Sequence, residues 1–325
     1  MVMLSATGCG GAGERVALNY GTGMDGLQYD TSLFARNDLD TAGADPGGIY
    51  VSKEQSEEYG GYYYVYTTGG SGNSFNSGYL PSEYTQEGIV GLSVKCYRSK
   101  DLSQWESAGS LLDGYCIAGY SEDWENWYGS GNVWAPEVIY DAATQKYYMY
   151  YNMYAKGSSG AVEVSANGFY IGVAVSDTPV GPFRALHNTD SETGVAIPLV
   201  NFEEHFGFSS HMPVIDVSPF RDPKEGGKLY LYFKGEATSG DAINSGHIYG
   251  MEMQDWTTPN YETIKCLLAP RAVSVTCDEG AEAALKLTGK QTVGTIDDAL
   301  TTNILEAPQC IEHNGKYYLT YSANG

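Results

Sequence analysis

Trp134-Ala-Pro-Glu-Val-Ile-Tyr140 is followed after a short turn by Lys146-Tyr-Tyr-Met-Tyr-Tyr151, and this pair of segments decides the fold. Aromatic and β-branched residues dominate both segments, which is typical of two antiparallel strands. The layout occurs three more times, each time with a carboxylate at the start of the first segment. The other copies are Asp45–Val51 with Tyr62–Thr67, Asp216–Asp222 with Lys228–Phe233, and Glu306–Glu312 with Lys316–Tyr321.

The copies begin at residues 45, 134, 216 and 306, so they are 89, 82 and 90 residues apart. Further strand pairs lie between them, over Gly91–Trp105, Ile171–Phe183 and His247–Trp256. Each repeat therefore provides about four strands, which is the content of one blade of a β-propeller. Helical patterns are scarce, and one short helix is expected over Glu279–Leu287. The repeats predict an all-β propeller with long connecting loops.

The end of the chain falls within a repeat. Ser322-Ala-Asn-Gly325 comes directly after the second strand of the fourth copy. A propeller needs its ring closed. We therefore expect one domain over residues 21–325 that carries about three and a half blades and continues beyond this chain.

The charge and composition of the chain exclude several classes of partner. Its 325 residues include 40 acidic and 18 basic side chains, for a net charge of −22. Such a field repels polyanions, which argues against nucleic acid as a partner. No apolar run approaches the roughly 20 residues that a membrane span needs. Of the 28 tyrosines, we expect most to fill half-buried strands and some to contact sugars.

The six cysteines form no C-x-x-C pair, so a zinc or redox motif is not expected. The start, Met1-Val-Met-Leu-Ser-Ala-Thr-Gly-Cys9, is similar to the end of a bacterial lipoprotein signal. In that interpretation Cys9 carries a lipid anchor, which is the one expected link to a membrane. The alternative is that residues 1–20 are a disordered start without function.

The acidic residues of the repeats suggest a site. Aligning the copies gives Asp45, Trp134, Asp216 and Glu306 one shared position, at the start of each first strand. First strands of propeller blades surround the central axis, so these side chains are expected to converge. An Asp before Pro often only caps a turn, but three converging acids serve no packing purpose and force their pKa values apart. Glycoside hydrolysis uses such a set: one acid protonates the leaving oxygen and one carboxylate activates water or attacks the anomeric carbon.

Two further carboxylates lie near this position. Asp222 is expected to cap the turn before Lys228, because the same alignment places it at the turn end of its strand. Its predicted equivalents are Val51, Tyr140 and Glu312. Glu137, three residues beyond Trp134, is expected to be a supporting residue at best.

These motifs together resemble glycoside hydrolase family 43, whose members are five-bladed β-propellers. The resemblance spans about residues 40–325, and the combination is more specific than any one motif. The matching segments are Asp45-Pro46, Trp134-Ala-Pro-Glu137, Asp216-Val-Ser-Pro-Phe-Arg-Asp222 with Gly227-Lys-Leu-Tyr-Leu231, and Glu306-Ala-Pro308 with Asn314-Gly-Lys-Tyr-Tyr-Leu-Thr-Tyr-Ser322.

The resemblance implies an inverting glycosidase that acts on arabinose- or xylose-containing plant cell-wall polysaccharides. The activity would be that of an α-L-arabinofuranosidase, an endo-arabinanase or a β-xylosidase. Asp45 would be the general base, Glu306 the general acid, and Asp216 the residue that orients Glu306 and raises its pKa. Trp134 would stack on the sugar; the alternative is a buried core tryptophan.

The resemblance implies no required cofactor, and it allows a structural calcium ion in the intact propeller. The family's last blade, which supplies a histidine near this ion in many members, has no counterpart here. His211 is the histidine closest to a catalytic motif and is expected to be structural, so no metal ligand is assigned.

Two other functions remain open. Phe220-Arg-Asp-Pro223 also resembles the retaining sucrose- and fructan-cleaving enzymes, although Ala44-Asp-Pro-Gly47 and Glu306-Ala-Pro308 depart from their motifs. A non-catalytic carbohydrate-binding propeller is the alternative outside enzymology, and the presence of all three acids argues against it. A polymeric substrate and the context of Cys9 predict an extracellular or cell-surface protein.

Overall fold

The computed structural model describes residues 43–68, 80–102, 104–120, 133–154, 169–189, 196–200, 214–224, 226–236, 246–269, 294–295 and 304–324. Cys9 with the whole of residues 1–20, His211, and the helix expected over residues 279–287 lie outside these ranges. No helix in the described ranges is long and apolar enough to cross a membrane.

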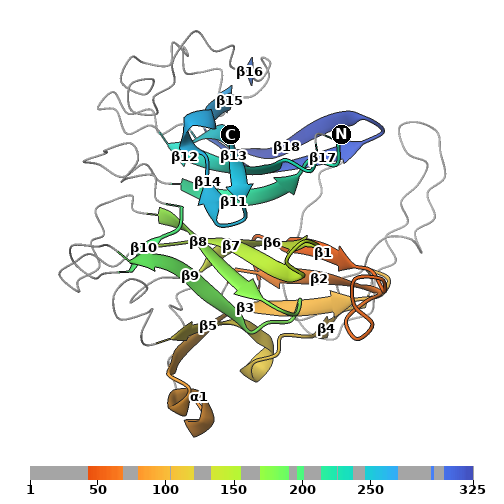
Figure 1. The fold of residues 1–325 in the computed structure, drawn as a ribbon, viewed down its shortest axis with the longest axis vertical. Helices are drawn as coiled ribbons and strands as arrows, with labels where there is room; N and C mark the ends of the chain where they lie inside the picture. Colours follow the sequence, from red (N-terminus) through yellow and green to blue (C-terminus); the bar gives the residue numbers. More distant parts are fainter. Residues whose placement is uncertain are drawn as a thin grey trace, which may run out of the picture.

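The described strands form two sheets, one of ten and one of eight strands (Figure 1). Within them lie three antiparallel four-stranded blades and a hairpin, linked by short parallel pairings of Ile117 with Phe183 and of Gly246 with Ile304. The first blade is β1 (Gly47–Val51), β2 (Tyr62–Thr67), β3 (Ile89–Ser99) and β5 (Tyr115–Tyr120); the second is β6 (Trp134–Asp141), β7 (Lys146–Tyr154), β8 (Phe169–Ser176) and β9 (Phe183–Thr189). The third is β11 (Val214–Arg221), β12 (Leu229–Glu236), β13 (Gly246–Asp255) and β15 (Lys265–Ala269), and the hairpin is β17 (Ile304–His313) with β18 (Lys316–Asn324). The first strands of successive blades contact one another: β1 with β6, β6 with β11, and β11 with β17. The predicted all-β propeller fold is confirmed, and the five blades of the whole ring stay a prediction.

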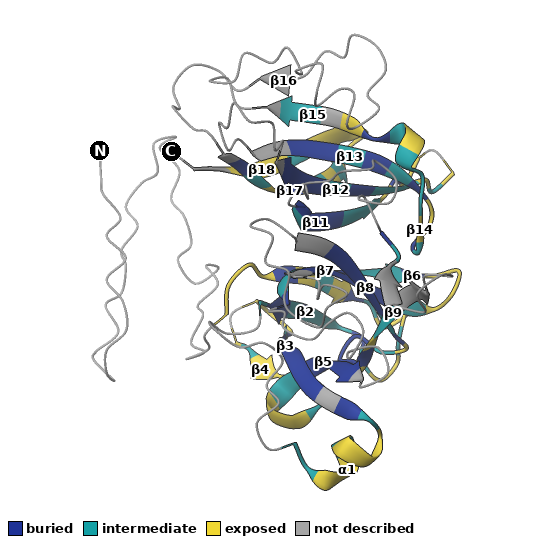
Figure 2. Ribbon diagram, turned by 90° about the vertical axis from the view of Figure 1, so that its left-hand side faces the viewer, coloured by how far each residue is buried: buried dark blue, intermediate teal, exposed yellow. Residues whose placement is uncertain are grey.

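Short elements decorate the blades. They are β4 (Glu106–Ser107), β10 (Ala196–Pro198), β14 (Thr258–Pro259), β16 (Gly294–Thr295), the helix α1 (Ser82–Gln86), and the 3₁₀ turns at Leu112–Gly114 and Tyr261–Thr263. Figure 2 shows α1 exposed at the edge of the first blade. The sequence did not predict α1, a five-residue helix without side-chain capping.

The tyrosine-rich strand β7 joins the blades because its side chains alternate between its two faces. Tyr147, Met149 and Tyr151 are buried against the first blade. Tyr148 and Tyr150 are buried against the third. The hydroxyl group of Tyr150 donates a hydrogen bond of 2.6 Å to the carbonyl oxygen of Trp256, so its burial leaves no unpaired donor. The run therefore fills two seams between blades, as expected for most tyrosines of this chain.

A bulge at the start of β6, β11 and β17 sets the register of the site, and Asp45, just before β1, has the same positive φ as the bulged residues. In the second blade Trp134 faces Asn152 and Glu137 faces Tyr150, so the two residues between them on β6 lie opposite one residue of β7. The residue at this position has a positive φ in every blade, a conformation that is uncommon outside glycine. These residues are Asp45 (φ 47°), Ala135 (43°), Asp216 (55°) and Ala307 (51°).

This register corrects the sequence alignment by one residue. Asp45 and Asp216 share the bulged position with Ala135 and Ala307, whereas Glu306 is equivalent to Trp134 and Ile215. The prediction that all three acids occupy one repeat position is therefore wrong. The sequence alignment matched residues by their charge, whereas the equivalent positions are defined by the backbone pairing at the bulge.

Asp222 caps a turn, as predicted. Its Oδ1 accepts a 2.8 Å hydrogen bond from the Lys224 N–H, and its own N–H donates to the Lys228 carbonyl oxygen. It also joins two blades, because the Tyr317 hydroxyl lies 2.8 and 2.9 Å from its two carboxylate oxygens.

The bulge register also corrects the predicted equivalents of Asp222. Val51 is equivalent to it, but Asp141 and His313 replace Tyr140 and Glu312. Asp141 has the same double role as Asp222, since it caps its own turn through Thr144 and forms an ion pair with Arg221 of the next blade.

Candidate active site

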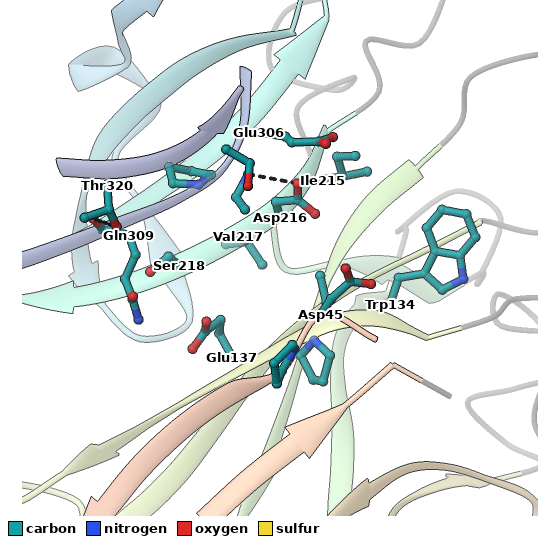
Figure 3. A pocket seen from close by; sticks show the side chains of 16 residues that line it. Asp45, Trp134, Glu137, Ile215, Asp216, Val217, Ser218, Glu306, Gln309 and Thr320 are labelled. Atoms are coloured by element: carbon teal, nitrogen blue, oxygen red, sulfur yellow. Dashed lines mark hydrogen bonds between the residues drawn. The ribbon is translucent and has the colours of Figure 1, made fainter. Parts of the chain in front are cut away.

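A cavity of about 530 Å³ lies where the bulged strands meet, a size typical of small-ligand sites. All four residues predicted for the site line it: Asp45, Trp134, Asp216 and Glu306. In Figure 3, Asp216 and Glu306 lie together on one wall, and Asp45 and Trp134 lie on the other. The fold thus brings together side chains that are up to 261 residues apart in the sequence (306 − 45).

Hydrogen bonds between blades hold the bulges in place. The Thr68 hydroxyl donates a 2.9 Å hydrogen bond to Oδ2 of Asp45 and accepts one of 2.9 Å from the Ala135 N–H. One threonine of the first blade therefore orients the Asp45 carboxylate and also fixes the strained start of the next blade.

Asn152 plays the corresponding role between the second and third blades. Its side-chain oxygen accepts a 2.9 Å hydrogen bond from the Asp216 N–H, and its amide nitrogen donates to the Val214 carbonyl oxygen. Asn152 is completely buried. Such a buried, satisfied amide fixes the Asp216 backbone at its positive φ.

Asp216 itself connects the third blade to the fourth. Its Oδ2 accepts a 3.0 Å hydrogen bond from the Ala307 N–H, the peptide group that follows Glu306. Burial raises the pKa of Asp216 to about 6, and the nearby charges of Glu306 and Asp45 act in the same direction. The Ala307 N–H and the ammonium group of Lys234 oppose this rise. The Asp216 carboxyl group therefore changes its protonation state near pH 6.

Lys234 is a site residue that the sequence analysis missed. Its Nζ lies 3.6 Å from Oε2 of Glu306, and its side chain is only 7% exposed. It faces Ile215 in the strand pairing, just as Asn152 faces Trp134, so it occupies the repeat position of Asn152 in the third blade. A lysine at the end of the apolar run Leu229–Phe233 was the available signal, because burying an unpaired ammonium group is costly.

The model of glycosyl hydrolases family 43 matches residues 54–325. The chain belongs to this family. Among curated proteins it is 34% identical over 88 residues to arabinan endo-1,5-α-L-arabinosidase C of Emericella nidulans; the match covers 27% of this chain and 23% of that protein. The chain thus matches less than a quarter of the length of that relative.

Solved structures with similarity to this family-43 chain include three with TM-scores below 0.5. A thermostable family-43 glycoside hydrolase has 23% identity and a TM-score of 0.49, covering 90% of this chain and 68% of that one. The endo-1,5-α-L-arabinanase of Thermotoga petrophila has 21% identity and a TM-score of 0.45, and the match covers 86% of this chain and 47% of that one. The exo-β-1,3-galactanase of Phanerochaete chrysosporium has 17% identity and a TM-score of 0.46, and the match covers 90% of this chain and 47% of that one.

The family-43 pocket also contains a fourth carboxyl group, that of Glu137. Burial raises its pKa to about 8, so it is mostly protonated at neutral pH. Trp134 lines the same pocket with part of its side chain accessible, which places it where a sugar could stack. Within the described ranges, no group of three or more His, Cys, Asp or Glu residues could hold a metal ion. The structural calcium ion stays a prediction.

Proposed function

We propose that this chain is the catalytic propeller of an inverting glycoside hydrolase. It would hydrolyse O-glycosidic bonds in arabinose- or xylose-containing plant cell-wall polysaccharides outside the cell or at its surface. The observation that carries the proposal is the convergence of Asp45, Asp216 and Glu306 on one pocket, in a chain of a glycoside hydrolase family. One buried cation, Lys234, balances part of their charge.

Glu306 acts as the general acid in this mechanism. It protonates the leaving oxygen of the glycosidic bond while Asp45, on the opposite wall, takes a proton from the attacking water. The Thr68 hydrogen bond holds Asp45 in one orientation for this task. Attack from the side opposite the leaving group inverts the anomeric carbon.

Asp216 acts as a positioning residue. Its hydrogen bond to the Ala307 N–H fixes the peptide group next to Glu306, and its negative charge opposes ionisation of the acid. The ammonium group of Lys234 lowers the pKa of Asp216, so it favours the negative charge that Asp216 places beside Glu306.

Arabinan is the first substrate to test, because the curated relative is named for its action on arabinan. Xylan is the second. Trp134 supports a sugar subsite beside the acids, since aromatic faces stack on the apolar faces of sugars.

The test compares Glu306→Gln and Asp45→Asn on natural oligosaccharides and on aryl glycosides. Glu306→Gln should lose at least a hundredfold in kcat/KM on the natural substrate, yet retain more activity on an aryl glycoside whose leaving group needs little protonation. Asp45→Asn should lose activity on both, because water must be activated in each case. Glu83→Gln on the exposed helix α1 is the control for the charge change.

NMR of the first product would establish whether the anomeric configuration is inverted. Retention of configuration would refute the inverting mechanism in favour of a nucleophilic carboxylate. Sugar binding without hydrolysis by the folded wild-type protein would instead indicate a carbohydrate-binding propeller.

A further inference from the structure

Glu137 lies two residues beyond the bulged Ala135 on β6, next to the three acids of the proposed mechanism in the same cavity. In the bulge register it is equivalent to Ser218 and Gln309, which line the same cavity. Figure 3 places these three polar residues together, away from Trp134. This part of the pocket is therefore lined by polar side chains.

The carboxyl group of Glu137 has no internal partner that accounts for its burial. Within the described ranges, no hydrogen bond and no neighbouring charge offsets the burial that raises its pKa. Buried carboxyl groups are normally paired or hydrogen-bonded. This group is instead directed at the cavity, so a ligand or solvent must satisfy it.

The first blade makes room for this side chain. A Cβ atom on Gly47 would lie 2.0 Å from the Pro136 carbonyl oxygen and 3.0 Å from both Cδ and Oε2 of Glu137. Only glycine at this position allows β1 to approach β6 so closely. The position of the carboxyl group is thus built by two strands from different blades.

We propose that Glu137 is a specificity-determining residue whose neutral carboxyl group binds a hydroxyl group of the sugar held between the three acids. The assignment rests on the proposed function, because it requires a sugar in this pocket. A neutral carboxylic acid both donates and accepts hydrogen bonds, and so does a sugar hydroxyl group. A carboxylate could only accept, and it would add a further negative charge to an acidic site.

Other titratable groups face Glu137 from the strands packed around it. Asp45 comes from the segment before β1, Asp216 from β11, and Glu306 from β17 with its partner Lys234 on β12. The pKa of Asp216 is about 6. Tyr150, opposite Glu137 on β7, and Tyr66, on β2 opposite Gly47, have pKa values raised well above 10 by burial. Between pH 7 and pH 9, loss of the Glu137 proton should therefore dominate.

The experiment measures ligand binding in the Glu306→Gln variant, in which the proposed acid no longer titrates. Hydrolysis assays with the wild-type protein first show whether it cleaves arabinotriose or xylotriose. The sugar that is cleaved is then titrated calorimetrically into the Glu306→Gln variant at pH 7 and at pH 9. Because the pKa of Glu137 is about 8, the fraction of Glu137 that is neutral falls from about nine tenths at pH 7 to about one tenth at pH 9. The Kd should therefore rise about tenfold over this interval.

Adding Glu137→Gln should remove this pH dependence, since an amide donates a hydrogen bond at every pH. Adding Glu137→Met should weaken binding about tenfold or more already at pH 7. Unchanged pH dependence with Glu137→Gln, or undiminished affinity with folded Glu137→Met, would overturn the assignment while leaving the proposed function intact. Failure of the wild-type protein to hydrolyse either sugar would overturn the proposed function and this assignment with it. Thermal unfolding checks that each variant is folded, and Glu137→Gln decides the question if Glu137→Met is not.

Discussion

Glu137→Gln should stabilise the protein relative to wild type, and this gain in the free energy of unfolding should be larger at alkaline pH than at acidic pH. The folded wild-type protein holds the Glu137 proton up to a pKa of about 8, whereas an exposed glutamate has the ordinary value of 4.5. Between these values the folded state binds more protons than the unfolded state. The free energy of unfolding of the wild type therefore falls as pH rises through this interval. Glutamine does not titrate, so the variant lacks this loss.

The magnitude follows from the pKa difference. The pKa of about 8 in the folded protein, against the ordinary 4.5, sets an upper limit of about 5 kcal/mol on this effect. The side chain retains some accessibility from the pocket, so water reduces the cost and we expect about 2–4 kcal/mol. The stability difference between variant and wild type should be small near pH 4.5, rise up to pH 8, and stay constant above it.

Urea denaturation of both proteins at intervals from pH 4.5 to pH 9.5 measures this difference. The slope with pH is the signal, because a constant offset reflects packing of the amide. Glu83→Gln removes a carboxylate from exposed helix α1 and should give a flat difference. A flat difference for Glu137→Gln as well would refute the reasoning, since the carboxyl group would then ionise as freely in the folded protein as in the unfolded chain.

Three further predictions concern the blades and their seams. Lys234→Met should move the pH profile of kcat/KM to higher pH, because Lys234 lowers the pKa of Asp216 and its loss would let that pKa rise. Lys228→Met is the control: Lys228 forms its ion pair on the surface, so this variant should not shift the profile. Asp222→Asn should lower the free energy of unfolding by about 1–3 kcal/mol, measured by urea denaturation, because it removes a buried charge that accepts hydrogen bonds from the Lys224 N–H and the Tyr317 hydroxyl. The value of kcat/KM should not change, and a loss of activity with intact folding would show that Asp222 belongs to the site. Gly47→Ala should destabilise the fold markedly in thermal unfolding because its Cβ would overlap the next blade, whereas Gly48→Ala, with its nearest contact at 3.3 Å, should be tolerated; equal effects would contradict the close approach of β1 and β6.

The sequence alone was sufficient for the fold class and for four residues that line the pocket. Both depend on periodic information, since tyrosine-rich strand pairs recur every 82 to 90 residues and an acid begins three of them. A repeat with this content can bury its strands only by stacking against its neighbours. Asp45, Asp216 and Glu306 therefore had to meet near the axis, and Trp134 with them.

Only the tertiary structure decided the register at the bulges and the neighbours of each acid. A bulge adds a residue to one strand without a mark in composition, so an alignment by charge placed Glu306 one residue out of register. Thr68 and Asn152 have no distinguishing feature in the sequence, and their roles arise from contacts with the next blade. The partner of Lys234, Glu306, likewise comes from another blade. The charge state of Glu137 likewise depends on burial between strands of different blades. Burial and hydrogen bonding are properties of groups brought together across some 80 to 90 residues of chain, and no local pattern encodes them.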